Sequence, residues 1–377
     1  MSQHIGSSRK IVIVEQASQP TRIPIRTVER WATEALRKAG LSAADAEVTA
    51  ASLAFAEERG VQTHGFIRLL TYVQRAKAGG IKGSGVAKIA SDLGALVIVD
   101  ADHVVGASSA MYAAGLAVER ARRHGIGCVA VRNANHFGVA AFYSSRIADA
   151  GLLGLVVCNT DKVMCAPGGG RAVLGTNPLA VTVPMPAEVR PQVDMATTQV
   201  SQGRLIMAAR NCEPIPLGWA VDAEGLPTTS AAAGLNGALL PAGGPKGFGL
   251  SFAIDALVAL SGALTSDQVG ALYGDPKEPQ RLGQLFMAIR ADAGVPLETY
   301  QKTIADLVEA IHGSGPASGG NKPMAPGEPE LARVRHNQGL LLLTEMLMDA
   351  LSEISASTGL ALPDEIDEAR TKTVAVH

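Results

Sequence analysis

The stretch that decides the fold runs from residue 128 to residue 140 and reads CVAVRNANHFGVA. Its first part, CVAVRN, is mostly small or β-branched and apolar, which is typical of a strand buried on both faces. The strand ends in polar residues around His136, and open α/β sheets bind their ligands just beyond such strand ends. A hydrogen-bonded structural role for His136 explains the pattern equally well, so the rest of the chain has to decide.

The neighbouring segments extend this strand into a β-α-β-α-β unit. Strands are expected at 95–102, 128–133 and 152–160, with helices at 106–125 and 140–151 between them. The strands do not alternate in polarity, and the helices are rich in Ala and Gly, so they can pack closely on a sheet. The sequence therefore predicts an α/β protein with a largely covered sheet.

The other expected elements surround this unit. Three helices, at 27–40, 42–60 and 65–78, form a small helical lobe near the N-terminus. A Gly/Pro/Ser-rich segment at 313–329 is expected to be a mobile loop. Further expected elements are strands at 178–184, 192–197 and 284–291, a buried helix at 248–264 and a last helix at 339–358.

Length and composition exclude several classes of protein. A chain of 377 residues exceeds one compact core, so two or three lobes are expected. The net charge of −2 offers no basic field for nucleic acid or for an anionic membrane. The apolar run Ile11–Val14 is too short for a signal peptide, and no run reaches the roughly 18 residues of a spanning helix. The four cysteines form no CxxC pair, which favours free thiols in a reducing cytoplasm over metal ligation or disulfides.

One glycine motif is misleading. Residues 125–130, GIGCVA, spell the GxGxxA dinucleotide fingerprint, but they follow a helix and open a strand, the reverse of the required order. No acidic residue follows about 20 positions later. We interpret Gly125 as the C-cap of a helix.

Other residues are better candidates for a site. His64 and Arg68 are four apart and would share a helical face, which places an imidazole beside a fork suited to a carboxylate. Lys246 lies between glycines before a helix, where an ammonium and backbone N–H groups would converge on an anion. Each has a plain alternative, a solvated arginine or an exposed lysine, but together with His136 they favour an enzyme. No HExxH motif or Ser-His-Asp elbow occurs, so neither a metal site nor acyl transfer is expected.

Seven motifs in fixed order make the chain similar to a known family. They are ERGVQTHGFIRL, NANHFG, GGGRAVLGTNPLA, DMATT, GWAVDAEGLPTT, LLPAGGPKGFGL and PGEPE, over roughly residues 25–350. The chain resembles the malate/L-lactate dehydrogenase family of NAD(P)-dependent oxidoreductases, which includes sulfolactate and ureidoglycolate dehydrogenases, diketogulonate reductase and piperideine-2-carboxylate reductase. It looks closest to the ureidoglycolate branch.

The resemblance implies a non-Rossmann three-layer α/β sandwich with a small helical lobe, assembled as a homodimer with a shared active site. The segments it implies are an N-terminal extension at 1–22, the helical lobe at 23–82 with 330–377, a substrate and dimerisation lobe at 83–125 with 285–312, the cofactor lobe at 126–284 and the mobile loop at 313–329.

The resemblance also assigns roles to residues. His64 and His136 would line the site as proton donor or acceptor, Arg68 would hold the substrate carboxylate, and Thr160 matches a substrate-contacting serine. Thr63 stands where the family usually has Ser after Asp, so a hydroxyl is kept but Gln62 removes a charge. NAD or NADP would lie along Asp194, Met195, Ala196, Thr197, Lys246, Gly247, Pro326, Gly327 and Glu328.

The expected reaction is hydride transfer between nicotinamide C4 and C2 of a small 2-hydroxy or 2-oxo acid, with a proton moved by an imidazole, His136 by preference. Ureidoglycolate oxidation and cyclic-imine reduction are the alternatives within the family. A non-catalytic cofactor-binding protein is the alternative from another class.

Overall fold

A computed structural model of the chain describes residues 21–368. The expected extension at 1–22 therefore lies almost wholly outside the described residues, as does the apolar run at 11–14. Within residues 21–368, no helix is both long and apolar enough to cross a membrane. The same part of the chain contains no group of three or more His, Cys, Asp or Glu side chains placed to hold a metal ion.

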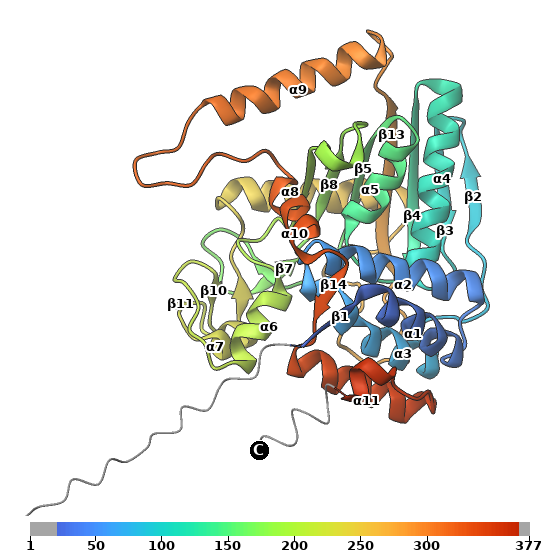
Figure 1. Cartoon of the computed structure of the whole chain (residues 1–377), viewed down its shortest axis with the longest axis vertical. Coiled ribbons are helices and arrows are strands. Elements are labelled where there is room, and N and C mark those ends of the chain that lie inside the picture. Colours follow the sequence, from blue (N-terminus) through green and yellow to red (C-terminus); the bar gives the residue numbers. More distant parts are fainter. Residues whose placement is uncertain (1–20, 369–377) are drawn as a thin grey trace, which may run out of the picture.

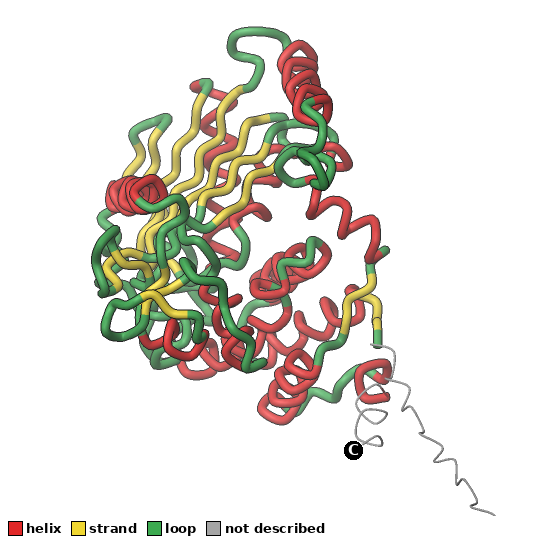
Figure 2. Tube along the Cα trace, turned by 90° about the vertical axis from the view of Figure 1, so that its left-hand side faces the viewer, coloured by secondary structure: helices red, strands yellow, loops and turns green. Residues whose placement is uncertain are grey.

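The central sheet contains the expected β-α-β-α-β unit in an unexpected order (Figures 1 and 2). From edge to edge its strands are β2 (Lys88–Asp92), β3 (Leu96–Asp100), β4 (Ile126–Ala134), β13 (Leu282–Arg290), β5 (Leu152–Cys158), β8 (Leu179–Thr182) and β9 (Gln192–Met195). Strands β3 and β4 are parallel, but β13 pairs antiparallel with both β4 and β5 and separates them. A late segment takes the central place because nearly all of β13 is buried.

Helices cover both faces of this sheet. Helix α4 (Gly106–His124) and helix α5 (Ala140–Asp149) pack on one face, where α4 buries a row of alanines against Val129 and Val131. Helix α8 (Pro245–Val258), followed by the 3₁₀ turn η4 (Ala259–Ser261), packs on the other face against Ala130 and Leu285. The small residues permit this close packing, as predicted. The expectation of a buried helix at 248–264 holds for one face only, because Phe252 on α8 is 63% exposed.

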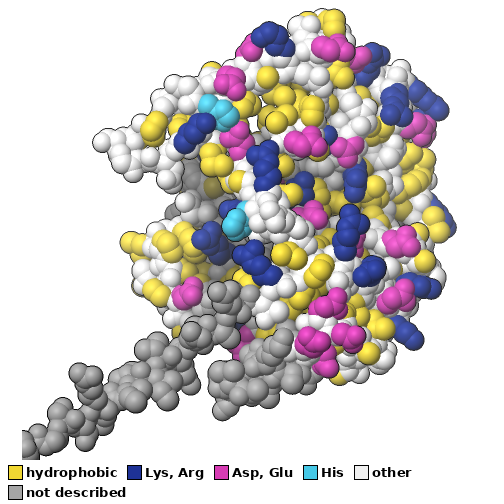
Figure 3. All heavy atoms as spheres, viewed as in Figure 1, with side chains coloured by type: hydrophobic (Ala, Val, Ile, Leu, Met, Phe, Trp, Pro, Cys, Tyr) yellow, Lys and Arg dark blue, Asp and Glu magenta, His cyan; other side chains and the backbone are white. Residues whose placement is uncertain are grey.

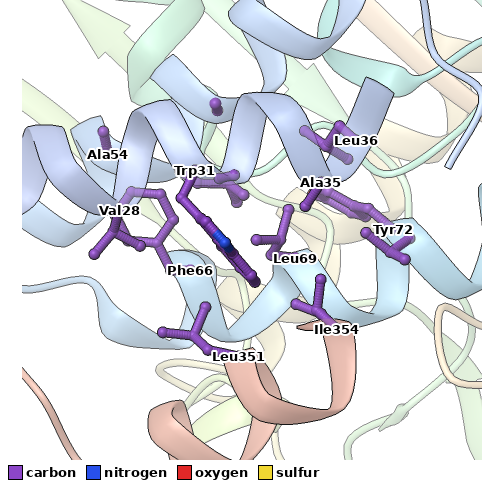
Figure 4. Packing of buried hydrophobic residues seen from close by; sticks show 14 of the residues in the cluster. Val28, Trp31, Ala35, Leu36, Ala54, Phe66, Leu69, Tyr72, Leu351 and Ile354 are labelled. Carbon is purple, nitrogen blue, oxygen red and sulfur yellow. The ribbon is translucent and has the colours of Figure 1, made fainter. Parts of the chain in front are cut away.

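The helical lobe has a core of its own (Figure 4). It is built by α1 (Ile25–Lys38), α2 (Ala43–Glu58), α3 (Leu69–Ala78) and α11 (Glu345–Thr358). Trp31 lies at its centre, with Leu69 and Leu351 packed around it. Two expected boundaries are wrong here. The segment 65–78 begins with the 3₁₀ turn η2 (Phe66–Arg68), which a second turn, η1 (Gln62–His64), precedes. The segment 339–358 begins with strand β14 (Leu340–Leu342), which pairs with β1 (Arg22–Pro24).

A second, smaller sheet was not expected from the sequence. Its order is β11 (Pro227–Thr228), β10 (Ala220–Val221), β12 (Ala238–Leu239), β6 (Met164–Cys165) and β7 (Ala172–Leu174), covered by α6 (Gln202–Arg210) and α7 (Ala231–Asn236). Strands of two or three residues contain too few positions for a period of two to show.

An arm leaves the body of the molecule (Figure 1). Helix α9 (Leu297–Gly313), which the sequence did not suggest, buries none of its residues. Residues 314–327 then return without regular structure to α10 (Glu328–Asn337), as expected for the Gly/Pro-rich segment. The turn η3 (Ala187–Val189) completes the element order. Mobility of this loop and the lobe boundaries stay predictions.

Candidate active site

A cleft lies between the helical lobe and the end of the central sheet. Its volume is about 720 Å³, within the range of small-molecule and cofactor sites. The helical lobe contributes the turns η1 and η2, and the sheet contributes the residues that follow β4 and β5 together with β9. Residues 324–330, which lead into α10, line its far end. On the face seen in Figure 3 the surface is hollowed below the arm, and Lys, Arg and His side chains lie along the hollow.

His136 lines the cleft directly after β4. Its backbone N–H donates to Gln280 Oε1 at 2.9 Å, which holds the turn that follows the strand. Its ring atom Nδ1 lies 2.7 Å from the Tyr72 hydroxyl and 3.3 Å from the backbone nitrogen of Gly138. Burial, followed by the nearby His64 and the arginine charges, lowers the pKa of His136 well below its usual value. At neutral pH this imidazole is therefore uncharged.

His64 lines the opposite wall of the cleft. Its ring stacks on that of His136, with 5.7 Å between ring centroids and 21° between planes. Its Nδ1 lies 3.1 Å from the Thr63 hydroxyl. Burial and the positive charge of Arg68 lower the pKa of His64 to about 3. The structure thus brings both candidate imidazoles to one cavity in their neutral forms.

Arg68 is held in the same wall. It is 7% exposed, its Nε donates to the Thr63 carbonyl at 2.6 Å, and its guanidinium lies 5.0 Å from the centre of the Tyr273 ring. Burial lowers its pKa to about 10, so it stays charged at neutral pH. Its two Nη atoms have no hydrogen-bond partner among residues 21–368. A buried fork with its outer donors free is suited to a carboxylate.

Thr160 reaches the cleft from the end of β5. Its backbone N–H donates to Asn177 Oδ1 at 3.0 Å, and its hydroxyl accepts the Thr176 N–H at 2.9 Å. Gly175 is required beside it, because a Cβ there would lie 2.4 Å from the Thr160 hydroxyl. Residues 175–177, with the sequence GTN, thus hold Thr160 in place.

The far end of the cleft fits a dinucleotide. Asp194 lines the wall of the cleft, and the limited access of water there, followed by the charge of Glu330, raises its pKa to about 7 against the lowering effect of the Ala141 N–H. Carboxylates in this place suit ribose hydroxyls, which can donate to them. Gly327 has a φ of +90° and lies against Gln192, so no side chain fits there.

Ten predicted residues line the cleft, and four do not. Those that line it are His64, His136, Arg68, Thr63, Thr160, Asp194, Met195, Ala196, Pro326 and Gly327. Thr197 is buried and donates to the Thr176 carbonyl, while Glu328 bonds to His312 outside the cleft. Lys246 is exposed at the start of α8, and Gly247 packs against Ala242.

Sequence reasoning missed several residues of this site. Tyr72 lies four residues after Arg68 and eight after His64, so helical spacing was a signal that could have found it. Glu57 lies beneath the turn with 7% exposure, and one of its oxygens, Oε2, has no partner in residues 21–368. Burial raises its pKa to about 8, although the Phe66 N–H lowers it. Tyr273 comes from a distant loop, and no local pattern marks it.

The family described as malate/L-lactate dehydrogenase matches residues 23–351. The chain belongs to this family. An L-sulfolactate dehydrogenase of Methanocaldococcus jannaschii is 34% identical, covering 89% of this chain and 96% of that protein. The solved structure of sulfolactate dehydrogenase from that organism superposes with a TM-score of 0.84, at 33% identity over 91% of this chain and 98% of the other.

Other members of the malate/L-lactate dehydrogenase family are similarly distant. A ureidoglycolate dehydrogenase (NAD(+)) of Escherichia coli strain K12 is 30% identical, over 89% of this chain and 98% of that protein. A (2R)-3-sulfolactate dehydrogenase (NADP(+)) of Chromohalobacter salexigens is 33% identical over 77% and 86%. Membership confirms the expected fold and the class of NAD(P)-dependent oxidoreductases. The structure also places Gly125 as the C-cap of α4, directly before β4, as expected for the GxGxxA segment.

Proposed function

We propose that the protein transfers a hydride between C2 of a small 2-hydroxy or 2-oxo acid and the nicotinamide of NAD or NADP. The observation that carries this proposal is the place of Arg68. Its charged fork is buried with its outer donors free, in the same cavity as the two stacked imidazoles. A carboxylate on that fork would hold the neighbouring C2 and its oxygen beside a group able to move a proton.

The chain's own residues would orient the two reactants. Asp194 and the backbone around Gly327 would hold the ribose end of the cofactor, and Met195 and Ala196 would line its path toward the imidazoles. When bound, the nicotinamide supplies the hydride chemistry. The Thr160 hydroxyl would form a hydrogen bond with the substrate. The apolar side chains of Val139 and Leu282, which line the cleft, would limit the access of water to the reacting atoms.

The substrate class is proposed from the arginine charge in the cleft. Arg59 and Arg68 both line the cleft, and Arg68 is the one whose charge acts on His64, so its fork suits one carboxylate beside the reacting carbon. Malate, sulfolactate and ureidoglycolate, for which relatives of this chain are named, all carry such a carboxylate. A 2-hydroxy acid of the malate or lactate type is the first choice, with ureidoglycolate and a cyclic imine carboxylate as the alternatives.

A panel of substrates tests this proposal. Purified protein is mixed with NADH or NADPH and with pyruvate, oxaloacetate, sulfopyruvate or piperideine-2-carboxylate, and in the other direction with ureidoglycolate and the oxidised cofactors. The expected result is loss of reduced-cofactor absorbance with at least one 2-oxo acid. Cofactor binding without turnover of any of them would support a non-catalytic binding protein instead.

We also infer a homodimer in the cytoplasm. Helix α9 buries none of its residues, and α8 with the following turn η4 shows an apolar outer face, where Phe252 is 63% and Leu260 57% exposed. Apolar faces of this kind are typical of subunit interfaces. All four cysteines are free, as a reducing compartment would keep them. Sedimentation analysis of the wild-type chain and a Phe252→Glu variant tests the interface.

A further inference from the structure

The two imidazoles of the cleft differ in what faces their Nδ1 atoms. Nδ1 of His136 faces the Gly138 backbone N–H at 3.3 Å and the Tyr72 hydroxyl at 2.7 Å. A backbone N–H can only donate, so this Nδ1 must be an unprotonated acceptor. A neutral imidazole has a single proton, which therefore lies on Nε2. That atom has no hydrogen-bond partner among residues 21–368, on a side chain that lines the cleft.

Tyr72 is placed to maintain this state. It lies on α3 with 2% exposure, within the packed core of the helical lobe (Figure 4). Its oxygen also faces the Gly138 N–H, which can only donate, and Nδ1 of His136 is the only acceptor for the hydroxyl proton among residues 21–368. The hydroxyl proton therefore points to that nitrogen. Two donors thus converge on one atom, which excludes the other tautomer.

Charges around His136 also oppose a second proton on it. Arg68 and Arg75 both act on it from the helical lobe, and His64 is stacked on it. Tyr72 is the remaining titratable group in contact, and burial keeps it protonated because its pKa is raised. His136 is thus confined to a single neutral form that donates through Nε2.

His64 is not held to one tautomer in this way. Its Nδ1 faces the Thr63 hydroxyl at 3.1 Å, and a hydroxyl can either donate or accept. With the proton on Nδ1 directed to Thr63, the Nε2 of His64 is open to accept. A carboxylate bound to Arg68 would also cancel a positive charge that now opposes protonation of His64.

We propose that Tyr72, with the Gly138 N–H, is a positioning residue that holds His136 as a fixed hydrogen-bond donor, and that His64 moves the proton. This assignment rests on the proposed function. In oxidation, the substrate O–H proton would pass to Nε2 of His64 as the O–H bond breaks, and a bound nicotinamide would take up the hydride that leaves C2. The C–O bond becomes C=O, and Nε2–H of His136 donates to its oxygen. Reduction is the reverse.

The assignment departs from the preference for His136 that the sequence suggests. That preference rested on the position of His136 at a strand end, which places the ring in the site but does not say which nitrogen carries a proton. The donors that decide this come from α3 and from the turn after His136, and only the folded chain brings them together.

The first test is spectroscopic and needs neither substrate nor cofactor. Full-length protein with ¹⁵N-labelled histidine is measured by NMR, and the His136 signals are assigned by their loss in His136→Gln. We expect an acceptor-type Nδ1 and a protonated Nε2 from about pH 5.5 to 8.5. In Tyr72→Phe only the more distant Gly138 donor remains at Nδ1, so both signals should move part of the way toward the average of two tautomers. A protonated Nδ1 in the wild type, or no change in Tyr72→Phe, would overturn the role of Tyr72.

The second test separates donation from proton transfer. Glutamine at position 136 keeps an N–H donor but cannot exchange a proton, so His136→Gln should lower kcat for oxidation about tenfold. His64→Gln should lower it by about a thousandfold or more, because acid–base catalysis is lost. Tyr72→Phe should lower kcat about tenfold with little change in KM. His124→Gln, on the exposed end of α4, is the matched control.

The outcomes distinguish the two proposals. If His136→Gln is as inactive as His64→Gln while the wild type turns over, the assignment of roles is wrong and the proposed function stands. If no 2-hydroxy or 2-oxo acid is turned over, the proposed function fails, and the NMR result alone decides whether Tyr72 sets the tautomer of His136.

Discussion

The two walls of the cleft are built in different ways. One wall comes from the central sheet, where His136 and Thr160 follow long strands whose backbones are paired on both sides. The other wall is the pair of 3₁₀ turns carrying His64 and Arg68, held by a few side-chain bonds over the buried Glu57. The difference teaches that the sheet wall fixes atoms in place, whereas the turn wall carries the groups whose charge and protonation can change.

The largest effect on the use of substrate at low concentration, apart from loss of the proton-transferring His64, is expected where the turn wall holds charge. Arg68→Lys removes the planar fork while keeping a positive charge, so kcat/KM for the acid should fall about a hundredfold, mainly through KM. Steady-state kinetics with the best substrate of the panel measures this. Arg333→Lys, an exposed residue of α10 paired with Glu330, is the control and should be unchanged. An unchanged KM in Arg68→Lys would contradict the proposed binding of the substrate carboxylate by Arg68.

The second prediction concerns the support under the turn wall. Because the pKa of Glu57 is raised from 4.5 to about 8, the folded protein holds a proton that the unfolded chain releases near pH 4.5. Stability is therefore lost as the pH rises from about 4.5 to 8. Glutamine at position 57 has no proton to lose, so Glu57→Gln should remove this loss. The free energy of unfolding of the variant should therefore exceed that of the wild type by an amount that grows with pH, to about a few kcal/mol at most.

Denaturant unfolding of both proteins at pH 5 and pH 8 measures the difference. The lowered pKa of His64 makes stability depend on pH below about 6.5 as well. This contribution is the same in both proteins, so it cancels in the difference between them. Glu34→Gln, an exposed carboxylate of α1, is the control. Equal pH dependence in wild type and Glu57→Gln would show that the buried carboxylate does not hold its proton.

The smallest effect is expected in the sheet wall. Thr160→Ser keeps the hydroxyl and should leave kcat/KM within about twofold, since the strand holds the backbone in place. Thr160→Val loses the hydroxyl and its bond to the Thr176 N–H, and should cost about tenfold. If both variants lose activity alike, Thr160 acts through its shape and not through its hydroxyl.

Much of the site was predictable because each of its residues carries a local signal. His136 follows a buried strand, His64 and Arg68 have helical spacing, and the motifs around Asp194 and Gly327 resemble those of a known family. Tyr273 was not predictable, since its role depends on a segment far along the chain that meets the site only after folding. Glu57 lies near His64 in sequence, but its burial beneath the turn depends on the packing of the helical lobe. Strand β13 shows the same limit, because its apolar sequence predicts a strand and not a place between β4 and β5.

The sequence by itself determined the strands of the central sheet except β2, the family, and the residue types gathered at the site, because periodicity, capping and motif order are local properties. Only the tertiary structure decided which nitrogen of His136 carries the proton. That depends on one hydroxyl from α3 and one backbone N–H meeting within a few ångströms of the ring. Hydrogen bonds are short and directional, so this information exists only where the folded chain brings the partners together.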